Sequence, residues 1–212
     1  MNEERAVLDF FAKEENLPLG LSVAEQMDTM RKQMNNRFWQ QLQQRLAASI
    51  EAQGLAWQVE PTEDRNAPDC LVGVHCSPSA DQEIYLRVMA EQQYLGREWH
   101  IYFGLMWSST PSPEHLGLSA VSSLKQTLLN AGFSNNANFL AWQWTAFHPC
   151  RRDFLLRYAR EPEILLDEMG ALLKKLLIDH GDSILQANTA LRSAPRSMTI
   201  SLERLHSKRS DY

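Results

Sequence analysis

The sequence is poor in cysteine and has no long apolar run. Its three cysteines, Cys70, Cys76 and Cys150, are an odd number and form no Cys-x-x-Cys pair. This excludes a secreted disulfide framework and is typical of a reducing compartment. No stretch approaches the roughly 18 uninterrupted apolar residues of a membrane span, and the acidic N-terminus has no apolar run of signal-peptide length. We therefore expect a soluble, cytoplasmic protein that does not insert into membranes.

The common catalytic motifs are missing as well. There is no Gly-x-Ser-x-Gly elbow, no Walker-type Gly-rich loop and no Gly-x-Gly-x-x-Gly. The formal net charge of -5 argues against a generic nucleic-acid coat, because phosphate binding needs an excess of Lys and Arg. Residues 1–140 carry 10 Lys and Arg against 17 Asp and Glu, whereas residues 141–212 carry 11 against 9. A basic patch in the C-terminal third is compatible with this distribution.

The clearest structural pattern is in residues 82–107, which predict two β-strands joined by a short connector. In each strand apolar and other side chains alternate, and successive side chains of a strand point to opposite faces. Each strand therefore has one strongly apolar face. That face carries Ile84, Leu86, Val88 and Ala90 in the first strand and Trp99, Ile101, Phe103, Leu105 and Trp107 in the second. We expect this hairpin to be the centre of the fold.

Three further segments are expected to be strands. Residues 55–60 and 70–76 precede the hairpin, with a polar, turn-rich loop at 61–68 between them. Residues 139–147 follow it, with Trp142 and Trp144 on one side. The short polar loops between the first four strands imply an antiparallel meander.

Helical patterns flank the strands. A short helix is expected over residues 3–13, with a break at 16–20 through Pro18 and Gly20. A Ser-x-x-Glu capping box, Ser22 to Glu25, is expected to open a long helix that ends near Gly54. At about 1.5 Å per residue this helix is roughly 45 Å long, so it crosses the whole sheet or projects toward a partner. Its apolar stripe consists of Met27, Met30, Met34, Phe38, Leu42, Leu46 and Ile50, joined by Trp39.

The C-terminal half is predicted to be mainly helical. Helices are expected from Ser112 to about residue 130, over residues 152–159 and from Glu161 onward, with a kink or end at 180–182. The predicted fold is α+β: a mainly antiparallel, four- to five-stranded sheet with the long N-terminal helix and the C-terminal helices packed mostly on one face. Residues 1–192 are expected to form a single domain. Residues 193–212 are expected to be a flexible or loosely docked tail, with a short strand at 198–202 if it docks.

One acidic cluster resembles a known family. Asp69 follows a proline, and Glu83 and Glu91 lie on a neighbouring predicted strand. This arrangement resembles the Pro-Asp…(Asp/Glu)-x-Lys motif of the PD-(D/E)XK nucleases. The resemblance covers about 25 residues and implies carboxylate ligands for a divalent metal. The positions that correspond to the family's lysine are Tyr85 and Gln93 in this sequence. The resemblance therefore implies a degenerate nuclease-like domain.

Two other polar groupings are candidate sites. His75, Cys76, His148 and Cys150 are residue types that bind zinc, but adjacent residues on a strand point apart, so buried or incidental cysteines are the better interpretation. We expect no metal and no cofactor. Basic residues beside Trp142, Trp144 and Tyr158 are candidates for nucleic-acid contact, or alternatively the solvated side of a helix. They are Arg151, Arg152, Arg157 and Arg160.

The sequence favours a non-catalytic, protein-binding role: an adaptor, a chaperone-like factor or a regulator, including self-association as a homo-oligomer. Six Trp and eight Met belong to the residue types enriched at protein interfaces. The interface candidates lie on the long helix, whose polar side can equally be solvated, and are Arg31, Arg37, Trp39 and Gln40. The alternative is a nucleic-acid-associated protein or a degenerate PD-(D/E)XK-like nuclease domain.

Overall fold

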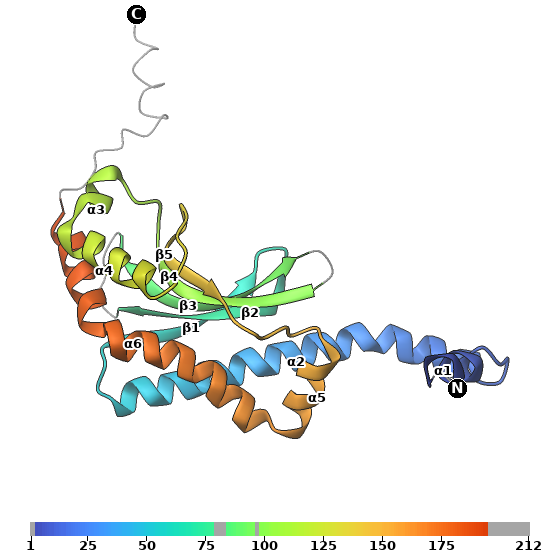
Figure 1. Cartoon of the computed structure of the whole chain (residues 1–212). Coiled ribbons are helices and arrows are strands. Elements are labelled where there is room, and N and C mark those ends of the chain that lie inside the picture. Colours follow the sequence, from blue (N-terminus) through green and yellow to red (C-terminus); the bar gives the residue numbers. More distant parts are fainter. Residues whose placement is uncertain (1–2, 79–83, 96–97, 195–212) are drawn as a thin grey trace, which may run out of the picture.

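A computed structural model describes residues 3–78, 84–95 and 98–194. The chain forms one antiparallel sheet in which every strand pairs with its neighbour in sequence, in the order β1-β2-β3-β4-β5 (Figure 1). The expected meander is therefore confirmed. The strands are β1 (Trp57–Asp64), β2 (Ala67–Pro78), β3 (Leu86–Leu95), β4 (Glu98–Trp107) and β5 (Phe139–Trp144).

The helices that cover the sheet lie on one of its faces. α2 packs on β1 and β2, α6 packs on β3 and β4, and α4 packs on α6 and β5. The predicted α+β class and its one-sided helical layer are confirmed. The helices are α1 (Glu3–Phe11), α2 (Leu17–Ala52), α3 (Pro113–Gly117), α4 (Ser119–Asn130), α5 (Arg152–Arg160) and α6 (Pro162–Ser193).

The predicted hairpin is the centre of the hydrophobic core. Val88 pairs with Leu105 and Ala90 with Phe103, and all four side chains are buried against the helices. The alternation seen in the sequence places these residues on one face, because the period of a strand is two. The helices contribute buried leucines and methionines to the same core, among them Leu42, Leu46, Met169 and Leu173.

The start of α2 differs from the prediction. Ser22 and Glu25 lie inside the helix and do not cap it, because α2 already begins at Leu17. Pro18 occupies the first turn, where the backbone N–H has no helical acceptor, so a proline is tolerated there. Gly20 also continues the helix, and the absence of a side chain leaves room for Phe11: a Cβ at Gly20 would lie 3.0 Å from the ring of Phe11.

The predicted loop at residues 61–68 is also wrong. β1 continues to Asp64 and β2 begins at Ala67, so only a tight turn separates them. The backbone N–H of Asn66 donates to the Asp64 carboxylate at 2.8 Å in this turn. Pro61 is accommodated within β1 because β1 is an edge strand, where a missing N–H donor is tolerated.

The remaining differences concern the C-terminal half. The predicted helix after Ser112 is interrupted at Leu118, whose extended backbone separates α3 from α4. α6 runs through residues 180–182 as continuous helix. The expected tail strand at 198–202, like Glu83, lies outside the described residues. No helix in the described part of the chain is long and apolar enough to cross a membrane.

Candidate functional site

The N-terminal part of the chain forms a helical arm that extends beyond the sheet. We define the arm as Glu3–Met30, which comprises α1, the turn after it and the first part of α2 (Figure 1). α1 has no buried residue, and the buried residues of α2 begin only at Phe38. The arm is therefore built from helix that the domain core does not cover.

Large apolar side chains are exposed along this arm. Among the described residues, sixteen large hydrophobic side chains are exposed, and eight of them lie in the arm. Large exposed apolar surface marks interaction sites in soluble proteins, and the arm gathers half of these side chains. The eight are Val7, Leu8, Phe10, Leu17, Leu19, Leu21, Val23 and Met30, with exposed fractions between 42% and 69%.

α1 contacts the start of α2 at the tip of the arm. The ring of Phe11 lies against Gly20, where no side chain intervenes. The side-chain amide of Asn16 donates to the backbone carbonyl of Phe10 at 3.0 Å and so satisfies a carbonyl in the last turn of α1. The two helices therefore form one structural unit at the tip.

The arm also carries the net charge of the protein. Residues 3–30 contain seven Asp and Glu and two Lys and Arg, a net charge of -5. The whole chain has the same net charge of -5, so the charges outside the arm cancel. The exposed apolar side chains of the arm are therefore accompanied by an excess of acidic residues.

Polar contacts fix the base of the arm to β2. The side-chain amide of Asn36 donates to the carbonyl of Asp69 at 2.7 Å, and its oxygen accepts from the N–H of Leu71 at 2.8 Å. Asn35 donates to the Leu71 carbonyl at 2.6 Å. Lys32 pairs with the Asp69 carboxylate, and this ion pair lowers the pKa of Asp69. These contacts determine where α2 leaves the sheet.

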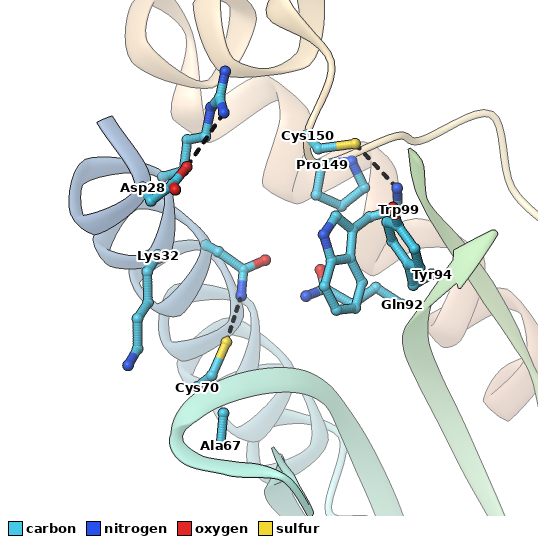
Figure 2. A pocket seen from close by; sticks show the side chains of 11 residues that line it. Asp28, Lys32, Ala67, Cys70, Gln92, Tyr94, Trp99, Pro149 and Cys150 are labelled. Atoms are coloured by element: carbon cyan, nitrogen blue, oxygen red, sulfur yellow. Dashed lines mark hydrogen bonds and ion pairs between the residues drawn. The ribbon is translucent and has the colours of Figure 1, made fainter. Parts of the chain in front are cut away.

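A pocket of about 530 Å³ lies at this point, between α2 and the end of the sheet (Figure 2). Figure 2 shows α2 with Asp28 and Lys32 on one side and the aromatic rings of Tyr94 and Trp99 on the other, with Cys150 above them and Cys70 below. Tyr94 and Trp99 contact each other edge to face, with ring centroids 5.7 Å apart. The lining residues are Asp28, Arg31, Lys32, Asn35, Ala67, Cys70, Gln92, Tyr94, Trp99, Pro149 and Cys150.

The two cysteines of the pocket are placed as packing groups. Burial raises the pKa of the Cys70 thiol, and a protonated thiol is a poor nucleophile and a poor metal ligand. The sulfur of Cys150 accepts a hydrogen bond from the backbone N–H of Trp99 at 3.0 Å. With its aromatic wall, the pocket is suited to receive an apolar side chain.

The predicted interface residues are not all at the surface. Arg31 lies at the edge of the pocket and pairs with Asp28, with 3.5 Å between the charged groups. Arg37 and Gln40 are exposed. The prediction that Trp39 is an interface residue is wrong. Its exposed fraction is 0%, and it belongs to the core because α2 directs this side chain toward β3.

The exposed apolar residues of the arm were missed from the sequence. Leu17, Leu19, Leu21 and Val23 lie in or beside the segment where Pro18 and Gly20 predicted a break. Their recurrence immediately before Met27 was the available signal, since it extends the apolar pattern of the long helix toward the N-terminus.

Asp69 and Glu91, the two described members of the acidic cluster, lie apart. Asp69 pairs with Lys32 of α2 on the helical side of the sheet, whereas Glu91 accepts a hydrogen bond from the Tyr102 hydroxyl, at 2.8 Å, on the opposite side. Glu91 is opposite Gly73 in the sheet, four residues beyond Asp69 along β2. At about 3.3 Å per residue, this register places the two carboxylates far apart.

The cysteine and histidine grouping is likewise dispersed. His75 lies within 3.2 Å of Glu60 on the helix-free face of β2, and Cys76 is buried in the core on the other face. His148 stacks on His100 of β4, with ring centroids 4.1 Å apart, and β3 lies between β4 and β2 in the sheet. Within residues 3–78, 84–95 and 98–194, no three His, Cys, Asp or Glu side chains are grouped to hold a metal ion.

The basic and aromatic candidates are partly brought together. Tyr158 lies on α5, the helix of three of the arginines. Arg151 and His148 share the Glu98 carboxylate, and His148 stacks on His100, which in turn stacks on Trp144. Arg151 forms a two-point hydrogen bond with Glu98, at 3.0 and 2.6 Å, and Arg157 pairs with Glu168. Arg152 and Arg160 are exposed. Their helix, α5, packs against Phe38 of α2. The indole rings of Trp142 and Trp144 contact Tyr102 on the helix-free face of the sheet.

Comparisons with known proteins give no match: no family model, no curated protein and no solved structure is significantly similar to this chain.

Proposed function

We propose that this protein is a non-catalytic, protein-binding adaptor, chaperone-like factor or regulator that contacts its partner through the arm. One observation carries the proposal: half of the exposed large hydrophobic side chains of the described residues lie on the arm, where no core covers them. Leaving such a surface in water is unfavourable by about 25 cal/mol per Å², so its burial by a partner is favourable.

The attachment of the arm supports the same role. α2 is one continuous helix from the exposed arm to the buried residues Phe38 and Leu42, and the contacts of Asn35 and Asn36 fix its direction. A rigid arm loses little conformational entropy when a partner binds, which favours affinity. Nucleic-acid binding has no comparable support, because Arg151 and Arg157 already pair with carboxylates.

The test replaces exposed apolar residues of the arm without changing the core. We would compare the wild-type chain with a variant carrying Leu17→Gln, Leu19→Gln, Leu21→Gln and Val23→Gln. Glutamine is polar and a good helix former, so α2 should persist, as circular dichroism would verify. The matched control carries Ile178→Gln and Leu185→Gln on α6, where both side chains are exposed at 62% and 42%.

Proteins captured from nuclease-treated native lysate would be quantified for all three chains, and the strongest partner purified for a direct affinity measurement. We expect a partner whose affinity drops at least tenfold for the arm variant and is unchanged for the α6 control. If both variants capture the same proteins as the wild type with equal affinity, the arm is not a binding surface.

A further inference from the structure

We infer that the arm and the pocket at its base bind a basic, amphipathic helix of the partner protein, with one apolar side chain of that helix in the pocket. The inference rests on the proposed function, because it specifies the chemistry of the partner for the same surface. Charge, helical geometry and the position of the pocket lead to it independently.

The charge of the arm selects the sign of the partner. The arm has a net charge of -5, and the remaining residues sum to zero. An acidic surface around apolar contacts attracts a basic segment and repels an acidic one. A second copy of this chain presents an equally acidic arm, so a symmetric arm-to-arm pair would place like charges together.

The side of α2 that faces the pocket continues outward as an apolar path. Leu17, Leu21 and Ala24 precede Asp28 at spacings of four, three and four residues, which places all four on one side of the helix. Leu17 and Leu21 are exposed at 47% and 57%, and Asp28 lines the pocket. A helix packed along this path would therefore reach the pocket directly.

The dimensions fit a short helical segment. The stretch of α2 from Leu17 to Met30 is about 20 Å long, so roughly four turns of a partner helix cover it. Helices pack through rows of side chains spaced three and four apart, which is the pattern that α2 offers. The pocket, at about 530 Å³, is within the usual range of binding pockets, roughly 300–1,000 Å³, and Tyr94 and Trp99 give it an aromatic wall.

The probes are two synthetic 18-residue amphipathic peptides with leucines spaced three and four apart. One carries lysine at its charged positions and the other carries glutamate at the same positions. A scrambled lysine peptide, without the helical spacing, controls for unspecific attraction. Affinities for the full chain would be measured by fluorescence anisotropy at low and moderate salt. We expect the lysine peptide to bind at least tenfold more tightly than the other two, and less tightly as salt rises.

Three variants localise the binding. Affinity for the lysine peptide should fall more in the variant with Leu17→Gln and Leu21→Gln, on the pocket side of α2. It should fall less in the variant with Leu19→Gln and Val23→Gln, on another side of this helix. A variant with Glu14→Lys, Glu15→Lys and Glu25→Lys should show the reversed preference between the two helical peptides. The bound lysine peptide should also slow N-ethylmaleimide labelling of Cys70 and Cys150, which line the pocket and are partly exposed, whereas the buried Cys76 should stay unlabelled with and without peptide.

Several results would overturn the inference. They are equal or tighter binding of the glutamate peptide, a preference that survives the three lysine substitutions, and unchanged labelling of both pocket cysteines. Binding only after removal of residues 195–212 would make the chain's own tail the occupant. If the wild-type chain is a dimer and the Leu17→Gln, Leu21→Gln variant is a monomer, the occupant is a second copy of this chain. If the chain sediments with phosphatidylglycerol vesicles in an arm-dependent way, the occupant is a lipid surface.

The two proposals fail separately. If neither helical peptide binds but the four-glutamine variant loses a protein partner, the partner chemistry is wrong and protein binding stands. If that variant keeps every partner of the wild type, protein binding through the arm is wrong.

Discussion

The indole nitrogen of Trp39 donates a hydrogen bond to the side-chain oxygen of Gln92 at 3.1 Å, with both residues buried. This contact joins α2 to β3 at the point where the buried part of α2 begins. Gln92 also lines the pocket, so the same pair connects the core to the base of the arm.

Replacing Trp39 by phenylalanine should destabilise the protein by about 2–3 kcal/mol, because the Gln92 oxygen is left buried without its donor and the indole volume is lost. Urea unfolding measures this difference. Adding Gln92→Met should cost less than the sum of the two single changes, since both polar partners are then absent. Strict additivity would contradict the importance of this hydrogen bond.

Two glycines should respond to alanine in opposite directions. A Cβ at Gly104 would lie 2.1 Å from the carbonyl oxygen of Ala141 and 2.7 Å from the Cα of Trp142, both backbone atoms of β5. Gly104→Ala should therefore destabilise the protein by about 3 kcal/mol, the upper end of the usual cost of overpacking. Gly181, within α6, has no atom within 4 Å of such a Cβ, so Gly181→Ala should stabilise by about 0.5–1 kcal/mol. Equal effects in urea unfolding would show that the β4–β5 contact is looser than described.

Stability should fall as the pH drops below about 6.5, the ordinary pKa of histidine. Burial, followed by the charge of Arg87, lowers the pKa of His75, with Glu60 acting in the opposite direction. Burial, followed by His100 and Arg151, lowers the pKa of His148, with Glu98 opposing.

In this range the folded protein holds fewer protons than the unfolded chain. The stability that the two neutral histidines contribute is therefore progressively lost as the pH falls through their lowered pKa values. Each histidine contributes at most about 1.4 kcal/mol per pH unit. A variant with His75→Gln and His148→Gln should show a flatter dependence in urea unfolding between pH 7.5 and 5. An unchanged slope would assign the pH dependence to other groups.

The tip of the arm should depend on Gly20. A leucine at this position would occupy the space of the Phe11 ring and separate α1 from α2. We expect faster trypsin cleavage after Lys13, in the turn between the two helices, as measured by mass spectrometry. The free energy of unfolding should change by less than about 0.5 kcal/mol, because α1 has no buried side chain. Unchanged cleavage would mean that other contacts hold α1.

Local patterns predicted most of the elements. The alternation in residues 82–107 predicted β3 and β4, the aromatic alternation near Trp142 predicted β5, and Ser112 was correctly identified as a helix N-cap. Two errors arose where a nominal breaker is tolerated by its position: Pro18 in the first turn of α2 and Pro61 on an edge strand. Such tolerance depends on neighbours that a local pattern does not contain.

The sequence by itself determined the strands, the long helix and the acidic N-terminus, because periodicity and charge are local properties of the chain. Only the tertiary structure decided how far along α2 the sheet reaches. The polar contacts of Asn35 and Asn36 with β2 set that position, so Trp39 is buried while Leu17 and Leu21 stay exposed. Both groups are apolar in the sequence and helical in the structure. What separates them is long-range packing, which brings residues 35–36 to residues 69–71 and leaves the arm outside the core.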